Sequence, residues 1–176
     1  MANPSPINFM RGVPADESYP ISELADAATA VLGERGVAML SYGPARGFAP
    51  LCEWLARWQD VAPERVLTAN GSLQIVELLC HTMITPGDVV FTESPTYDRT
   101  ITILRRHRAE LVGIPLAADG PDIAALEREL GRRVPKFFYT IPDFQNPAGA
   151  TCSGDKRRRI VELARRHGFL ILEDAP

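Results

Sequence analysis

Short apolar runs alternate with longer amphipathic segments through the chain after position 63. Runs of four or five mainly apolar residues have strand length, and they predict strands at residues 66–69, 89–92, 110–114, 137–141 and 169–173. Between them, apolar residues recur every three or four positions and predict helices at about residues 72–84, 97–107, 123–131 and 154–167. This alternation predicts an α/β fold, with a mainly parallel sheet covered by helices on both faces.

The first third of the chain has a different pattern. Residues 1–20 contain four prolines and no clear period, which predicts an extended arm. Helical spacing of apolar residues follows at about residues 21–34 and 48–58, with an irregular loop at 39–47 between them. We therefore expect two domains: residues 1–62 form the arm and its helices, and residues 63–176 form the sheet.

Composition and charge narrow the functional classes. The chain is 45% hydrophobic and 23% charged, as globular proteins are, and its net charge of −3 argues against nucleic acid as the main partner. We expect the one basic run, residues 156–159, to be a solvated helix face. No apolar run reaches the ~18 residues of a membrane span and no signal peptide is recognisable, so we expect a cytoplasmic protein. The three cysteines are far apart, which favours neither a disulfide framework nor a metal site.

Candidate chemistry lies in the segments that follow the strands. Ligands of parallel sheets bind at the carboxyl ends of the strands, so these segments should meet at one edge. Gly71 and Ser72 open a helix, where free backbone N–H groups favour an anion such as phosphate. Tyr97 offers an aromatic ring, Asn146 an amide and Asp174 a carboxylate. Each residue alone is as typical of an ordinary turn or cap, but together they fit a flat, phosphate-bearing ring with a protonated nitrogen.

Five ordered motifs now carry a family resemblance. They are S-Y-G-P-A-R-G at 41–47, T-A-N-G-S-L-Q at 68–74, E-S-P-T-Y at 93–97, P-D-F-Q-N-P-A-G at 142–149 and L-E-D-A-P at 172–176. In this order they resemble the amino-terminal portion of a class I/II, fold type I aminotransferase. The resemblance implies pyridoxal 5'-phosphate as the cofactor, amino transfer between amino acids and 2-oxo acids, and residues 63–176 as part of the large cofactor-binding domain.

The resemblance also assigns roles to individual residues. Gly71, Ser72 and Leu73 would bind the cofactor phosphate, Leu73 standing where relatives often have glutamine. Tyr97 would stack on the cofactor ring, and Asn146 would bind its phenolic oxygen and contact the substrate.

Three further positions complete these implied roles. Asp174 would pair with the protonated ring nitrogen of the cofactor, and Gly12 would lie near the substrate carboxylate. Tyr42 would reach the cofactor phosphate of a neighbouring subunit, which implies a homodimer.

The chain departs from the family pattern at its carboxyl end. It stops at Pro176, and the Schiff-base lysine of the family is expected downstream of that residue. Its two lysines are poorly placed to replace it, since Lys136 precedes a strand and Lys156 should point into solvent. We therefore expect an amino-terminal fragment that does not transaminate alone. The alternatives are a cofactor-sensing domain of a transcriptional regulator and a non-catalytic binding module.

Overall fold

The computed structural model describes residues 14–175, which form two compact units that meet in sequence between Thr68 and Ala69. Residues 1–13, with most of the predicted arm and Gly12, lie outside the described residues. The first unit contains η1 (Asp16–Ser18), α1 (Ile21–Leu40), α2 (Ala49–Trp58) and η2 (Pro63–Arg65). In the described part of the chain, no helix combines the length and the apolarity needed to cross a bilayer.

Both helices of the first unit were predicted, but α1 is longer than expected. It continues past Gly36 and ends where the backbone N–H and the hydroxyl of Ser41 both donate to the carbonyl oxygen of Val37. The irregular loop therefore begins at Ser41 instead of residue 39.

The strand expected at residues 66–69 is absent from the described structure. Val66 closes the turn of η2 by donating to Pro63, and the N–H of Thr68 donates to the carbonyl of Arg46 at 2.9 Å. This contact is a single backbone bond rather than a ladder. It needs Gly47, whose φ is +122° and whose hypothetical Cβ would lie 2.0 Å from the Thr68 hydroxyl.

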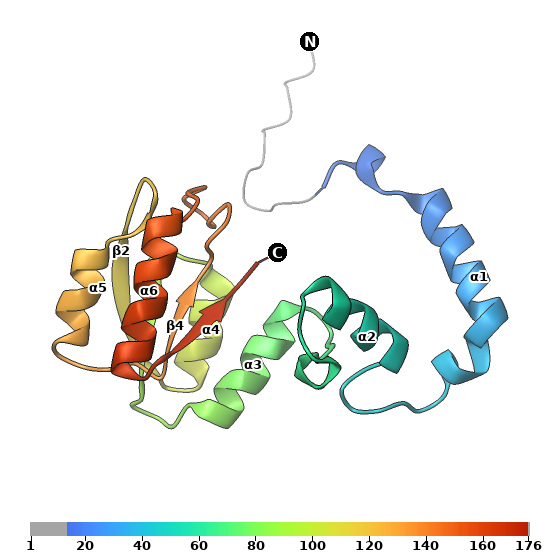
Figure 1. Ribbon diagram of the computed structural model, residues 1–176, viewed down its shortest axis with the longest axis horizontal. Coiled ribbons are helices and arrows are strands. Elements are labelled where there is room, and N and C mark those ends of the chain that lie inside the picture. The colour runs from blue at the N-terminus through green and yellow to red at the C-terminus, as the bar shows by residue number, and fades with distance from the viewer. Residues whose placement is uncertain (1–13, 176) are drawn as a thin grey trace, which may run out of the picture. The chain divides into compact units, whose positions relative to one another are not determined.

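The second unit is the predicted sheet (Figure 1). The strands are β1 (Val89–Ser94), β2 (Glu110–Ala117), β3 (Gly120–Pro121), β4 (Phe137–Thr140) and β5 (Leu170–Glu173), in the order β3-β2-β1-β4-β5. All pairs are parallel except β2 with β3. The four longer strands confirm the prediction, whereas β3 was missed because Gly-Pro is a poor strand sequence.

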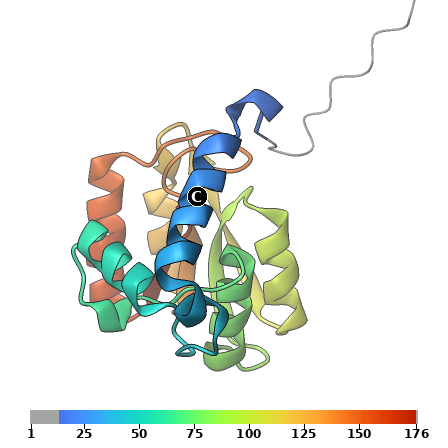
Figure 2. The same cartoon turned by 90° about the vertical axis from the view of Figure 1, so that its right-hand side faces the viewer.

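Helices cover both faces of the sheet, as predicted. On one face of the sheet, a hydrophobic cluster packs strand residues such as Phe91 and Phe138 against α5 (Ile123–Leu130) and α6 (Gly154–His167). On the opposite face, a second hydrophobic cluster packs strand residues such as Val90 and Tyr139 against α3 (Ser72–Met83) and α4 (Asp98–Arg106). Figure 2 shows these helix layers on the two sides of the sheet, α6 in red and α4 in yellow-green. The fold is therefore a three-layer α/β sandwich.

The basic run at the start of α6 is solvated only in part: the Arg158 side chain is 73% exposed, whereas that of Lys156 is 18% exposed. Lys156 binds Asp119 at 2.7 Å and the Gly120 carbonyl at 3.2 Å, which ties α6 to the β2–β3 hairpin. The other three residues also pair with carboxylates, namely Arg157 with Asp143, Arg158 with Asp155, and Arg159 with Glu127 and Glu162. The four basic side chains therefore form ion pairs within the chain.

The exposed side of β5 makes aggregation of the isolated chain an expected result. Within the described residues β5 pairs only with β4, and Leu170 on it is 56% exposed. Unpaired strand edges of this kind associate with one another. We expect Leu170→Lys to raise the monomer fraction in size-exclusion chromatography with light scattering, and Val161→Lys on α6 to have less effect. A monodisperse, cooperatively unfolding wild-type monomer would contradict this expectation.

Candidate functional site

The segments after three neighbouring strands come together at the carboxyl edge of the sheet. Strands β1, β4 and β5 are adjacent and parallel, so residues 95–97, 141–149 and 174 follow at the same end. Two contacts confirm this: the N–H of Asp174 donates to the Thr140 carbonyl at 2.9 Å, and Gln145 Nε2 donates to the Pro95 carbonyl at 3.0 Å. Three of the four segments predicted for this edge therefore follow adjacent strands, whereas the fourth, residues 70–74, follows no strand in the described structure.

The amino end of α3 faces open space. Gly71 is the N-cap with φ +82°, a conformation that favours glycine, and no atom would lie within 4 Å of a Cβ placed there. Ser72 is exposed and Leu73 is half-buried. First-turn N–H groups have no acceptor within a helix, so those of Ser72 and Leu73 can bind an anion.

A shared hydrophobic cluster joins this helix end to the strand edge. Leu73 at the start of α3 and Tyr97 at the start of α4 both pack on the cluster that contains Tyr139. The buried Tyr139 hydroxyl in turn donates to Asp174 Oδ2 at 2.7 Å. Four of the predicted elements of the site, the two helix starts and the ends of β4 and β5, are thus on one face of the sheet.

The Tyr139 hydroxyl is a hydrogen-bond donor to the Asp174 carboxylate. Burial, and then the hydrogen bond to Asp174, raises the pKa of Tyr139 well above its usual range. The phenol therefore stays protonated and acts as the donor. It occupies one carboxylate oxygen of Asp174, and the described residues provide no hydrogen bond to the other, Oδ1. Asp174 is half-buried at the end of β5 and can offer that oxygen to a cationic group.

The loop at 142–149 separates its two amides. Gln145 is 1% exposed and its amide binds protein groups, so it is not available to a ligand. Asn146 is exposed, and its side chain makes no hydrogen bond to any described residue. Asn146 is therefore the amide that the loop presents.

Two residues that support this loop were missed from the sequence. Glu93, near the end of β1, is 2% exposed and accepts hydrogen bonds from Thr140, Ile141 and Gln145. Arg157 on α6 donates to the carbonyls of Pro142 and Cys152 and to Asp143. The only sequence feature that could have indicated a role for Glu93 is a carboxylate at the end of an apolar strand. Arg157 stands in a run of arginines, so its contacts with the loop could not be predicted from the sequence.

Tyr42, Lys136 and Lys156 belong to other segments of the described chain. Tyr42 belongs to the first unit and is fully exposed, and Gly12 lies outside the described residues. Lys136 lies at the amino edge of the sheet, as predicted, where its Nζ is 3.4 Å from Asp88 Oδ2. Lys156 does not point into solvent, since Asp119 and Gly120 hold it.

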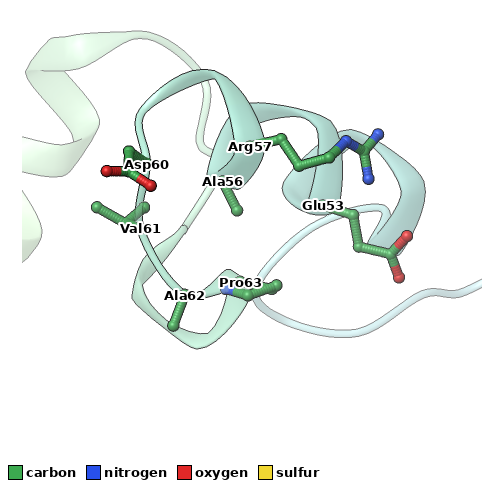
Figure 3. A pocket seen from close by; sticks show the side chains of 7 residues that line it. All are labelled: Glu53, Ala56, Arg57, Asp60, Val61, Ala62 and Pro63. Carbon is green, nitrogen blue, oxygen red and sulfur yellow. The ribbon is translucent and has the colours of Figure 1, made fainter.

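The first unit has a hollow of its own between α2 and η2 (Figure 3). It measures about 620 Å³ and is lined by Glu53, Ala56, Arg57, Asp60, Val61, Ala62 and Pro63. Figure 3 shows the Glu53 and Arg57 side chains on one side of it and Asp60 and Val61 on the other. None of the predicted site residues lines this hollow.

The groups at the sheet edge fit pyridoxal 5'-phosphate. The donor set combines an open helix amino end, an aromatic ring, a free amide and a carboxylate with one available oxygen. Next to the aromatic Tyr97, the buried hydroxyl of Thr96 has no hydrogen-bond partner among the described residues. A polar, flat ligand would satisfy the helix end, the amide and the carboxylate, whereas the Thr96 hydroxyl is buried within the protein.

Comparisons with known proteins agree with this chemistry. The family profile described as "Aminotransferase class I and II" matches residues 5–175. The chain is 37% identical over 171 residues to a 2-aminoadipate transaminase of Thermus thermophilus, covering 97% of this chain and 43% of that protein. It is 36% identical over 182 residues to an aromatic-amino-acid aminotransferase of Thermococcus litoralis, covering 97% of this chain and again 43% of that protein.

A solved structure is similar as well. The structure of LysN, an alpha-aminoadipate aminotransferase from Thermus thermophilus complexed with N-(5'-phosphopyridoxyl)-L-leucine, superposes with a TM-score of 0.89 at 37% identity. The match covers 94% of this chain and 43% of that one. This chain therefore spans less than half the length of the relatives that it matches.

Proposed function

The chain belongs to the class I and II aminotransferase family, and from this premise we propose that it supplies the cofactor-binding part of a pyridoxal-phosphate-dependent transaminase. The reaction is the transfer of an amino group from an amino acid to a 2-oxo acid. The observation that carries the proposal is the placement of Leu73, Tyr97 and the Tyr139–Asp174 pair on one face at the carboxyl edge of the sheet.

Each side chain has a distinct role in this proposal. Gly71, Ser72 and Leu73 bind the phosphate through N–H groups and the Ser72 hydroxyl, because the helix amino end favours an anion. Tyr97 packs on the ring and Asn146 donates to the ring's phenolic oxygen.

Asp174 completes the arrangement with an electrostatic role. Its free oxygen holds a proton on the ring nitrogen, while Tyr139 fixes the orientation of the carboxylate. The cofactor, when bound, supplies an electron sink for the substrate α-carbon.

Partners and subunits belong to the same proposal. We propose a homodimer in which Tyr42 binds the cofactor phosphate of a second copy, and a place for Gly12 near the substrate carboxylate. The fully exposed ring of Tyr42 supports the first of these roles. The relatives named above are described as transaminases, which favours the enzyme over a regulatory sensor domain or a non-catalytic module.

The lysine of the reaction is expected in the part of the family's length that this chain does not match. Lys156 is 18% exposed and its ammonium is held by Asp119, and Lys136 lies at the opposite edge of the sheet. Neither ammonium is therefore a free amine at the ends of β1, β4 and β5. Residues 1–176 should therefore bind the cofactor without forming a covalent bond to it.

Titration of the 176-residue chain with pyridoxal 5'-phosphate tests the proposal. We expect reversible binding of one equivalent by calorimetry, and no covalent adduct by mass spectrometry after borohydride reduction at equimolar cofactor. Lys136→Arg and Lys156→Arg variants are the controls, and both should bind as the wild-type chain does. Absence of binding would contradict the proposed function. A stoichiometric adduct at either lysine would contradict the inference that the Schiff-base lysine is not among residues 1–176.

A further inference from the structure

We propose that Glu93 is the positioning residue for Asn146: its buried carboxylate, acting through Gln145, fixes the loop that presents the Asn146 amide. This inference deepens the proposed function and rests on it for the role of Asn146. The geometry of the loop itself stands independently of that function. Glu93 exchanges no proton and touches no ligand in this assignment.

The surroundings of Glu93 are those of a structural acceptor. Its side chain is 2% exposed, and among the described residues no lysine, arginine or histidine forms an ion pair with it. Three donors bind it instead: Thr140 Oγ1 to Oε1 at 2.5 Å, Ile141 N to Oε2 at 3.2 Å and Gln145 Nε2 to Oε2 at 2.9 Å. A buried carboxylate is costly unless such donors are present, so its place here reflects the need to hold them.

Gln145 passes this restraint to the tip of the loop. Its Nε2 also donates to the Pro95 carbonyl, and its Oε1 accepts from the N–H of Ala148 at 2.9 Å. Its own backbone N–H donates to the Ala150 carbonyl at 2.9 Å, and its carbonyl accepts from Gly149. Every polar group of Gln145 is therefore used, and residues 146–149 form an exposed tip closed around it.

The loop has a second, separate anchor. Arg157 on α6 binds Pro142 and Asp143 at the start of the loop and Cys152 shortly after its end. Among the described residues, Arg157 forms no hydrogen bond or ion pair with the tip, residues 146–149. The ends thus depend on Arg157, whereas the conformation of the tip depends on Glu93 and Gln145, and a change at Glu93 should act on Asn146 in particular.

A double-mutant cycle for cofactor affinity tests this role in the 176-residue chain. We expect Glu93→Ala, Gln145→Ala and Asn146→Ala each to weaken pyridoxal 5'-phosphate binding by about 10-fold, the range of one lost hydrogen bond. Glu93→Gln should stay within about 3-fold, because its carbonyl oxygen can still accept from Ile141 and Gln145 while its amide donates to Thr140. Glu110→Ala on the exposed start of β2 is the control and should bind normally.

The combined variants separate positioning from general destabilisation. If Glu93 acts through Asn146, the Glu93→Ala, Asn146→Ala double variant should bind no more than about 3-fold more weakly than Asn146→Ala alone. Losses that multiply to about 100-fold would overturn the proposal. If Glu93→Ala does not fold, the pair Gln145→Ala and Asn146→Ala gives the same comparison, since Gln145 is the intermediary.

Amide hydrogen exchange provides a readout that does not need the cofactor. The amides of Ala148 and Gly149 should exchange faster in Gln145→Ala and Glu93→Ala, while those of β1 stay protected as in the wild-type chain. Unchanged exchange at both amides would overturn the role of Glu93. If the wild-type chain binds no cofactor but these amides respond as expected, the proposed function fails while the loop mechanism stands.

Discussion

Phe138→Ala is expected to lower the free energy of unfolding of the sheet-containing unit by about 3–5 kcal/mol, the range for truncating a buried phenylalanine. Phe138 lies on β4 with no exposed surface, between β1 and β5, and packs into the cluster that α5 and α6 cover. The loss combines the transfer free energy of the ring with the cavity that it leaves. Because natural domains are stable by only about 5–15 kcal/mol, this loss would remove a large share of the total stability.

A second phenylalanine in the same unit provides a matched control. Phe144 is 82% exposed and has a φ of +50°, a conformation that alanine tolerates no better. Phe144→Ala should therefore change the unfolding free energy by less than about 0.5 kcal/mol, as exposed substitutions usually do. Urea titrations followed by circular dichroism at low protein concentration measure both variants. Equal losses in the two would contradict the assignment of the core.

The elements that the sequence predicted correctly are those with a strong local period. The spacing along α4 and α6 and the apolar runs of β1 and β4 contain enough information to place each element within a few residues. The strand predicted at residues 66–69 was wrong because an apolar run does not specify a pairing partner. Thr68 donates one backbone hydrogen bond to Arg46 and pairs with no strand. Strand β3 has only two residues, and a tertiary contact of its Gly120 with Lys156 secures it.

The same distinction between local and long-range features applies to the candidate site. Gly71, Tyr97, Asn146 and Asp174 could be found because each follows a strand or begins a helix at the edge where parallel sheets bind ligands. The contact between Glu93 and Gln145 could not be predicted, because the two residues are 52 positions apart and only the paired strands β1 and β4 bring them together. Long-range hydrogen bonds of this kind leave no period in the sequence, and neither did the contact of Lys156 with Asp119.

Asp174→Ala is expected to weaken pyridoxal 5'-phosphate binding by at least about 100-fold, which corresponds to about 2.8 kcal/mol at 1.4 kcal/mol per tenfold. The carboxylate is half-buried at the end of β5, and its removal would leave a protonated ring nitrogen without a counter-charge. The backbone N–H of Asp174, which binds Thr140, is unaffected by the change, so the strand edge should keep its structure.

Two related variants show which property of Asp174 matters. Asp174→Asn keeps the shape and the bond to Tyr139 but removes the charge, so it should lose nearly as much affinity as Asp174→Ala if ion pairing dominates. Tyr139→Phe removes the donor to Oδ2 and leaves the charge, so we expect a smaller loss of about 10-fold, the range of one lost hydrogen bond. Calorimetry gives the affinities, and the near-ultraviolet absorption of bound cofactor reports its protonation. Wild-type affinity in Asp174→Asn would mean that the carboxylate acts through its shape and hydrogen bonds, and that the ring nitrogen is bound unprotonated.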